Sequence, residues 1–200
     1  MGKIDEAVAT ARPNTGYGMT ETNAQGASLT GRAFHEKPGT AGFPHPICDI
    51  RIADEAGAEI PQGDTGEIWV RSVTNIREHW NRPDANASDF RDGWLKTGDV
   101  GRMDEDGFTY IEDRKKDMIL VGGFNVYPRE VEDILFTHPK VALAAVVGVP
   151  DAKSGESVKA FIQLKPGESA TEEEIRQFCK ENMAGYKRPK MIEFREDIPV

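Results

Sequence analysis

The sequence has two cysteines in 200 residues, no long apolar run and no cluster of basic residues. Cys48 and Cys179 lie too far apart for a zinc-ligand pair or a disulfide framework, so we expect both to be packing residues in a reducing cytoplasm. No apolar stretch approaches the roughly 18 residues that a membrane-spanning helix needs, and the N-terminus lacks the apolar core of a signal peptide. The composition therefore predicts a soluble, cytoplasmic protein.

The charge balance is acidic, with a formal net charge of −9. Because no cluster of five or more Lys and Arg offsets this field, the sequence argues against a nucleic-acid surface, and any phosphate binding has to be local. The histidines show no ligand or triad spacing with acids or cysteines. We assign no catalytic role to His35, His45, His79 and His138.

Residues 40–113 have the pattern of short strands between turns. Strands are expected at 50–52, 67–71 and 108–111, where apolar residues alternate with polar ones or follow a tight turn. From residue 117 the pattern changes to alternating strands and helices. The predicted order is a short buried strand at 118–121, a helix from Pro128 to Pro139, strands at 141–149 and 157–164 around a loop at 151–155, a helix behind a Thr171–Glu174 capping box, and a strand at 191–194. This order, βαββαβ, predicts a small α+β domain behind a β-rich region.

Three short motifs carry the functional signal: Asn-Thr-Gly-Tyr-Gly-Met-Thr-Glu at 14–21, Trp-Leu-Lys-Thr-Gly-Asp at 94–99 and Asp-Arg-Lys-Lys-Asp at 113–117. Two glycines around an aromatic residue let the backbone approach a flat ring, and the adjoining hydroxyl and carboxylate suit a phosphate oxygen and its Mg²⁺. An Asp after Thr-Gly can hold a ribose diol, and a nearby Arg can answer phosphate charge. Together the motifs indicate an ATP site.

In this order and spacing the motifs resemble the adenylate-forming superfamily of acyl-CoA synthetases, luciferases and peptide-synthetase adenylation domains. The resemblance runs from about residue 3 to the end, and residues 113–132 are most similar to fatty acyl-CoA ligases. It implies part of an ATP-dependent fatty acid–CoA ligase, which forms acyl-CoA, AMP and pyrophosphate through an acyl-adenylate. Fatty acid, ATP and coenzyme A would be its substrates and Mg²⁺ its metal, and peripheral association with a membrane is compatible with this activity.

The resemblance also implies a nucleotide site made of Gly16, Tyr17, Gly18, Thr20, Glu21, Asp99 and Arg114. In the resembled enzymes the Tyr ring stacks on adenine, Thr20 would contact the α-phosphate, and Glu21 would bind Mg²⁺. Thr20 and Glu21 are thus the candidate catalytic residues. Asp99 would accept hydrogen bonds from both ribose hydroxyls, and Arg114 would contact ribose and phosphate. From the residues alone, plainer roles stay open. Tyr17 could be a core aromatic residue, and Thr20 with Glu21 could cap a helix. Asp99 could be a turn residue, and Arg114 could form a surface ion pair.

The same family has a small C-terminal domain that swings between an adenylation pose and a thioester-forming pose. Its hinge lies two residues after the motif's Arg, which is Lys116 here. Residues 1–115 would then be the C-terminal part of the large domain, and 116–200 the small domain. Gly122 and Gly123 would line the pantetheine tunnel, although a simple turn fits them equally well. Lys187 would attract the 3′-phosphate of CoA, unless it is an ordinary surface cation.

Two parts of the family pattern are not seen in the sequence. The phosphate loop rich in glycine and Ser/Thr would lie upstream of residue 16, and a catalytic Lys would follow residues 195–199. We therefore expect a piece of a longer enzyme that is inactive as a ligase by itself. The alternatives are a peptide-synthetase or aryl-acid adenylation domain, and a non-catalytic module with the same fold.

Overall fold

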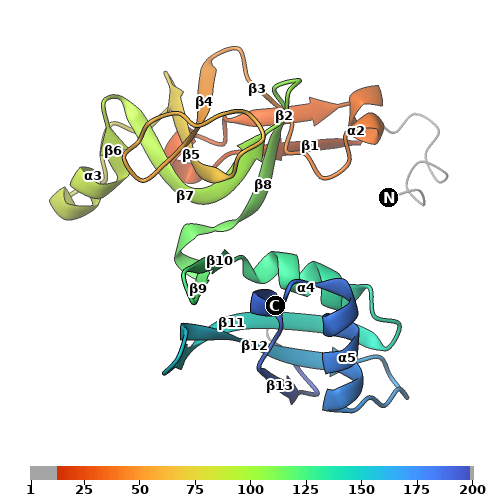
Figure 1. Cartoon of the computed structure of the whole chain (residues 1–200). Helices are drawn as coiled ribbons and strands as arrows, with labels where there is room; N and C mark the ends of the chain where they lie inside the picture. Colours follow the sequence, from red (N-terminus) through yellow and green to blue (C-terminus); the bar gives the residue numbers. More distant parts are fainter. Residues whose placement is uncertain (1–12, 199–200) are drawn as a thin grey trace. The chain divides into compact units, whose positions relative to one another are not determined.

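The computed structural model describes residues 13–198, which divide into two compact units, 13–112 and 113–198 (Figure 1). The predicted α+β class, with a β-rich first part, is confirmed. The first unit ends at Glu112 and the second begins at Asp113, three residues before the domain boundary predicted at 115/116. The functional boundary at 115/116 stays a prediction. Residues 1–12 and 199–200, which the predicted domains include, lie outside the described residues.

The first unit is built from two antiparallel sheets. The three-stranded sheet has the order β1-β2-β3, and the five-stranded sheet has the order β4-β5-β7-β6, with β8 paired to β7. The elements are β1 (Asn14–Tyr17), the 3₁₀ turn η1 (Thr20–Thr22), β2 (Ala27–Thr30), α2 (Arg32–Glu36), β3 (Phe43–Pro44), β4 (Cys48–Ala53), β5 (Gly66–Ser72), α3 (Pro83–Asp89), β6 (Phe90–Arg91), β7 (Trp94–Met103) and β8 (Thr109–Arg114).

Alternation along the strands builds the core of this unit. Ile52 of β4 and Ile68 and Val70 of β5 are buried together, and Tyr17 of β1 packs against them. The three-stranded sheet is thus anchored to the larger one by an aromatic side chain. The strands predicted at 50–52 and 67–71 lie inside β4 and β5, and the predicted strand 108–111 overlaps β8.

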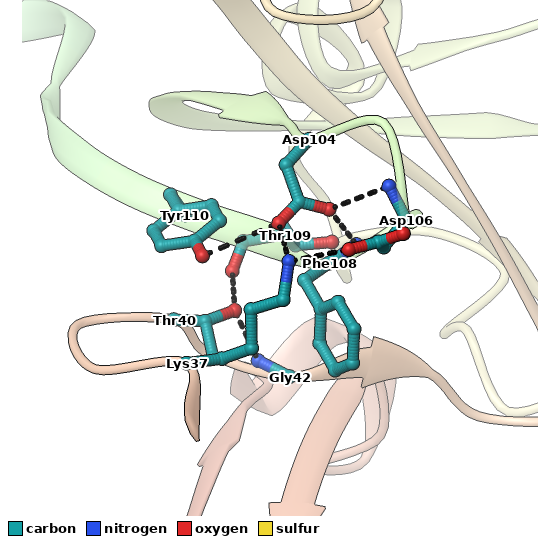
Figure 2. A network of polar contacts seen from close by, with 8 residues as sticks. All are labelled: Lys37, Thr40, Gly42, Asp104, Asp106, Phe108, Thr109 and Tyr110. Atoms are coloured by element: carbon teal, nitrogen blue, oxygen red, sulfur yellow. Dashed lines mark hydrogen bonds and ion pairs between the residues drawn. The ribbon is translucent and has the colours of Figure 1, made fainter. Parts of the chain in front are cut away.

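An ionic network ties the segment after α2 to the turn before β8 (Figure 2). The Lys37 ammonium contacts the carboxylates of Asp104 at 2.8 Å and Asp106 at 2.6 Å, and these bonds raise the pKa of Lys37 above its usual range. Tyr110 donates its hydroxyl to the same Asp104 carboxylate at 3.3 Å. The amide of Gly107 donates to the Asp104 carbonyl, as in the predicted turn. This network fixes one corner of the unit.

The second unit is a sheet with two helices. Its elements are η2 (Lys115–Asp117), β9 (Ile119–Val121), β10 (Phe124–Val126), α4 (Pro128–Phe136), β11 (Val141–Asp151), β12 (Gly155–Leu164), α5 (Glu172–Asn182), η3 (Gly185–Lys187) and β13 (Met191–Phe194). The sheet order is β10-β9-β12-β11, and β13 pairs parallel to β12. The predicted order of strands and helices is therefore confirmed, with β10 added as the partner of β9.

The core of this unit lies on one face of its sheet. Ala144, Ala160 and Ile192 share that face by register, and side chains of α4 and α5 cover it. Pro128 opens α4 as predicted, and the Thr171 hydroxyl caps α5 by accepting from the Glu174 amide at 3.2 Å. The buried strand predicted at 118–121 is β9, and it is buried on one face only, since Leu120 is 47% exposed. This follows from the β9–β10 hairpin, which has only one covered face.

The two cysteines are free and buried, one in each unit, as the packing prediction requires. Burial raises the pKa of the Cys179 thiol, so the thiol stays protonated and unreactive. Within residues 13–198, no helix has the length and apolarity to cross a membrane.

Candidate active site

The glycine-rich motif at 14–18 forms β1 and the chain that leaves it. This strand and its hydrogen-bonded neighbour β2 line a groove of about 450 Å³ together with His45. The His45 ring bonds to Gln25 and Ser28, so its position is fixed by side-chain contacts. A flat ligand that enters here meets strand backbone and small side chains.

The two glycines of the motif serve different purposes. A Cβ added to Gly18 would lie 2.5 Å from the carbonyl carbon of Ala24, so this glycine lets two segments of the chain pack together. A Cβ on Gly16 would only come to 3.5 Å from the Ala27 oxygen, which is ordinary contact. Of the two glycines predicted to open the backbone to a ligand, Gly18 is thus required by the packing of the fold, and for Gly16 the ligand role stays a prediction.

Thr20 and Glu21 lie on η1, directly after the groove strand. The turn is closed by Thr22, whose hydroxyl exchanges hydrogen bonds with the amide and carbonyl of Met19. The Glu21 carbonyl accepts from the Ile76 amide at 2.7 Å, and this holds the turn against a neighbouring loop. Thr20 is exposed and Glu21 is half-buried, so both side chains remain accessible beside the groove.

Asp99 lies in a bulge of strand β7 and not in a turn between strands. Trp69 of β5 faces Lys96, while Glu67 faces Val100, so β7 carries two additional residues in this stretch. The Thr97 hydroxyl closes the bulge: it donates to the Ile68 carbonyl at 2.7 Å and accepts from the Asp99 amide at 3.1 Å. Gly98 adopts φ of +71°, which favours glycine. Bulges of this kind aim a side chain out of the regular sheet pattern.

The bulge brings two predicted nucleotide residues into contact. The Tyr17 hydroxyl donates to Oδ2 of Asp99 at 2.7 Å, across 82 residues of sequence. Asp99 is only 9% exposed. An aromatic residue that lines the groove is thus bonded to a carboxylate, as a site for a flat base and its attached sugar would need.

Arg114 and Lys116 lie where the second unit begins. Arg114 ends β8 and Lys116 lies in η2, and both are exposed. Between β8 and α4, Asp113 makes a contact that the sequence did not reveal: its Oδ2 accepts from the backbone amide of Arg129 at 3.0 Å. Since Tyr127 at the start of α4 supplies no side-chain cap, Asp113 satisfies a free amide of the helix N-terminus.

Lys116 and Asp113 border a pocket of about 480 Å³ that is rich in carboxylates. Glu132 accepts from the Val146 amide at 2.8 Å, and Glu156 accepts from the Leu120 amide at 2.8 Å. Burial raises the pKa of Glu132, and the nearby charge of Asp113 adds to the shift. Asp113 thus bonds to the start of α4, Glu132 connects α4 to β11, and Glu156 connects β12 to β9.

Gly122 and Gly123 form the two-residue turn of the β9–β10 hairpin. Val121 pairs with Phe124 across it, and the two glycines have φ of +59° and +88°. Positive φ at both central residues is the geometry of a type I′ turn, which favours glycine for backbone reasons. A Cβ on either would meet nothing within 4 Å, so the space beside the turn is open.

Lys187 lies in η3 and forms an ion pair with Glu130 of α4. Burial by itself would lower the pKa of Lys187, but the Glu130 carboxylate outweighs it, and the pKa is raised. The neighbouring Arg188 donates to the carbonyls of Met183 and Lys180 at the end of α5. Lys187 and Arg188 therefore both have partners inside the second unit.

Within residues 13–198, no group of three or more His, Cys, Asp or Glu is arranged to hold a metal ion. Mg²⁺ that arrives with a nucleotide needs no such group, because it takes one or two carboxylates together with phosphate oxygens and water. An accessible single carboxylate such as Glu21 fits that requirement.

Comparison with known proteins agrees with the three motifs. The model of the AMP-binding enzyme family matches residues 5–80, and the model of the AMP-binding enzyme C-terminal domain matches residues 130–200. The long-chain-fatty-acid–CoA ligase of Yersinia pestis is 47% identical over 186 residues, which cover 92% of this chain and 32% of that protein. The chain thus spans about a third of the length of the curated relatives it matches.

Solved structures show the same likeness. The o-succinylbenzoate coenzyme A synthetase of Bacillus subtilis, in complex with ATP and a magnesium ion, is 39% identical with a TM-score of 0.83, and the match covers 93% of this chain and 38% of that one. The amide bond synthetase McbA of Marinactinospora thermotolerans is 39% identical with a TM-score of 0.84, covering 94% and 39%, respectively. With both family models, its motifs and its fold in agreement, the chain belongs to the AMP-binding, adenylate-forming enzymes.

Proposed function

We propose that this chain provides the nucleotide-binding residues and the small domain of an ATP-dependent fatty acid–CoA ligase. The observation that supports the proposal most directly is the contact between Tyr17 and Asp99 beside the groove. In such a ligase the carboxylate of the acid attacks the α-phosphorus of ATP and pyrophosphate leaves. The CoA thiol then attacks the acyl carbon and displaces AMP.

Each candidate residue of the first unit has one task in this proposal. The Tyr17 ring takes the adenine, with Gly16 leaving room along the strand, and Asp99 accepts the ribose hydroxyls. Thr20 donates to the α-phosphate, and Glu21 holds the Mg²⁺ of the MgATP substrate. The metal offsets negative charge as the α-phosphorus is attacked.

The second unit serves the thioester step. Lys116 is the hinge, Arg114 contacts ribose and phosphate, and Gly122 and Gly123 border the path of the pantetheine arm, where the open turn leaves space. Lys187 attracts the 3′-phosphate of CoA, and that phosphate competes with Glu130 for the ammonium.

The proposal is tested on the longest reading frame that encodes this chain. AMP release that depends on both acid and CoA is measured over a panel of fatty acids of different length, and fatty acids are expected to be the best substrates. Asp99→Ala removes charge-assisted hydrogen bonds of about 1.5–3 kcal/mol each, so the KM for ATP should rise at least about tenfold. Asp64→Ala, in an exposed turn, is the matched control. An unchanged KM for ATP in Asp99→Ala would refute the nucleotide role.

A second candidate activates aromatic acids. It is favoured by the likeness to the o-succinylbenzoate coenzyme A synthetase. Including aromatic acids in the same panel separates the two, because only the preferred class should combine low KM with CoA-dependent turnover. A phosphopantetheine-carrier domain encoded downstream would favour a peptide-synthetase adenylation domain instead.

A further inference from the structure

We infer that Tyr17 is a positioning residue whose hydroxyl fixes the Asp99 carboxylate for the ribose of ATP. This inference rests on the proposed function, because it assigns to Tyr17 a share of the ribose contact in addition to the stacking role of its ring. It predicts that the hydroxyl and the ring of the same side chain act on different parts of one nucleotide.

The contact has the geometry of a strong hydrogen bond. The Tyr17 hydroxyl lies 2.7 Å from Oδ2 of Asp99, and a distance near this value is typical of O–H donors to ionised carboxylates. Asp99 is 9% exposed, so little water competes for the bond. Without this bond, Oδ2 of a nearly buried carboxylate would lose one hydrogen-bond donor.

Tyr17 and Asp99 are each also held by contacts within their own sheets and the adjoining core. Tyr17 is paired with Ala27 across β1 and β2, and its ring packs against the cluster of Ile52, Ile68 and Val70. Asp99 is fixed at its backbone by the Thr97 hydroxyl. The hydrogen bond therefore connects strands β1 and β7, and it holds the Asp99 carboxylate at Oδ2.

The orientation matters because of the number of acceptor positions. An ionised carboxylate offers about four lone-pair sites, and the Tyr17 hydroxyl occupies one of them on Oδ2. A ribose diol brings two donors, so two further acceptor positions of this carboxylate have to be turned toward the ribose. A carboxylate that is already fixed loses less conformational freedom when the nucleotide binds.

Tyr17→Phe separates the two roles, since it keeps the aromatic ring and removes only the hydroxyl. In the longest reading frame that encodes this chain, we expect the KM for ATP to rise about three- to tenfold, with kcat changed less than about twofold. The same substitution should have little effect with 2′-deoxy-ATP and 3′-deoxy-ATP, which make fewer ribose contacts. In an Asp99→Ala background it should add nothing.

Tyr110→Phe is the matched control. Tyr110 also donates its hydroxyl to an Asp carboxylate in the same unit, at 3.3 Å from Oδ2 of Asp104 (Figure 2). Its removal changes the same chemistry in the ionic network around Lys37, and we expect the KM for ATP to stay at the wild-type value. Thermal unfolding of both variants checks that they fold.

The outcomes distinguish the two levels of the proposal. If Asp99→Ala raises the KM for ATP and Tyr17→Phe does not, the positioning role is overturned and the proposed function stands. If neither variant changes ATP use, the nucleotide site itself is refuted.

Should Tyr17→Phe not fold, Asp99→Asn takes its place, because its amide oxygen can still accept from Tyr17. A smaller penalty than that of Asp99→Ala is then expected, and equal penalties would overturn the inference.

Discussion

The two units hold their candidate residues in different ways. In the first unit, Tyr17 and Asp99 come from separate sheets, and their side chains form a partly buried hydrogen bond with each other. In the second, Lys116 lies in an exposed 3₁₀ turn, and Gly122 and Gly123 lie in a hairpin turn whose geometry is a property of the backbone. The candidate residues of the first unit are thus held by side-chain contacts, whereas Lys116, Gly122 and Gly123 of the second unit lie in exposed turns.

This difference predicts two kinds of mutational effect. Substitutions in the first unit should alter stability or nucleotide affinity, because rigid packing sets the site. Substitution of Lys116 in the second unit should instead alter the conversion between conformations, because backbone dihedral angles are what has to change. The following four predictions, in order of decreasing effect, test this contrast and the contacts that stabilise the second unit.

The strongest effect is expected for Gly18→Ala. The new Cβ would lie 2.5 Å from the backbone carbon of Ala24, and backbone cannot yield as a flexible side chain does. Overpacking of this kind should reduce the free energy of unfolding of the first unit by about 3 kcal/mol. Hydrogen exchange of the first unit's amides, measured at increasing urea concentration, gives this free energy of unfolding.

Gly16→Ala is the control within the same motif. Its Cβ would make only ordinary contact at 3.5 Å with the Ala27 oxygen, so the free energy of unfolding should change by less than about 0.5 kcal/mol. Equal losses for the two variants would contradict the distinction between a packing glycine and a groove glycine.

Lys116→Pro should affect one half-reaction more than the other. Proline fixes φ and removes a backbone donor, so it should obstruct the dihedral change that domain rotation requires. In the longest reading frame, transfer of the acyl group from preformed adenylate to CoA should slow by at least about tenfold, equal to about 1.4 kcal/mol, while pyrophosphate exchange largely survives. Lys116→Ala controls for the lost charge. Equal slowing of both half-reactions would show that Lys116 is not the hinge.

Asp113→Ala should weaken the N-terminus of α4. The helix would lose the carboxylate that accepts from the Arg129 amide, and loss of such a cap costs about 1 kcal/mol. Exchange protection of amides in the second unit should fall, with no change in the first. The exposed Asp117→Ala provides the comparison, and an equal effect there would mean that general charge and not capping is responsible.

Glu132→Gln should have the smallest effect and a defined pH dependence. Burial raises the pKa of Glu132, so its favourable contribution is present below the unfolded pKa of about 4.3 and is lost as the pH rises through the folded pKa. Glutamine keeps an oxygen for the Val146 amide and carries no charge. The variant should be more stable than wild type by about 0.5 kcal/mol at pH 7, and the difference should vanish near pH 4. A less stable variant at pH 7 would show that the ionised hydrogen bond outweighs burial.

The second unit could be predicted from the sequence because its signals are local. Pro128 and the Thr171–Glu174 pair mark helix starts within a few residues, and the strand at 157–164 has clear alternation. The contact between Asp113 and the start of α4 was missed, since nothing in a charged run tells which carboxylate will reach a backbone amide 16 residues away.

The first unit was harder to predict, because glycine interrupts its patterns. Strand β1 went unrecognised since Gly16 breaks the alternation of a four-residue strand. Gly98 suggested a turn, whereas β7 continues through it because the Thr97 hydroxyl reaches the Ile68 carbonyl 29 residues away. The family resemblance placed Tyr17 and Asp99 in one site, but their direct bond depends on how two sheets meet and cannot be read from either motif.

The bulge in β7 also affects how the strand can vary. Because it adds two residues and not one, the inward and outward alternation on either side of Thr97–Asp99 stays in phase, with Leu95 and Val100 still facing their partners in β5. Deleting a single residue here would invert every side chain beyond it, and deleting two would restore a plain strand without Asp99 in its present direction. The bulge is therefore a two-residue insertion that can be gained or lost without changing which side chains of the remaining strand face the core.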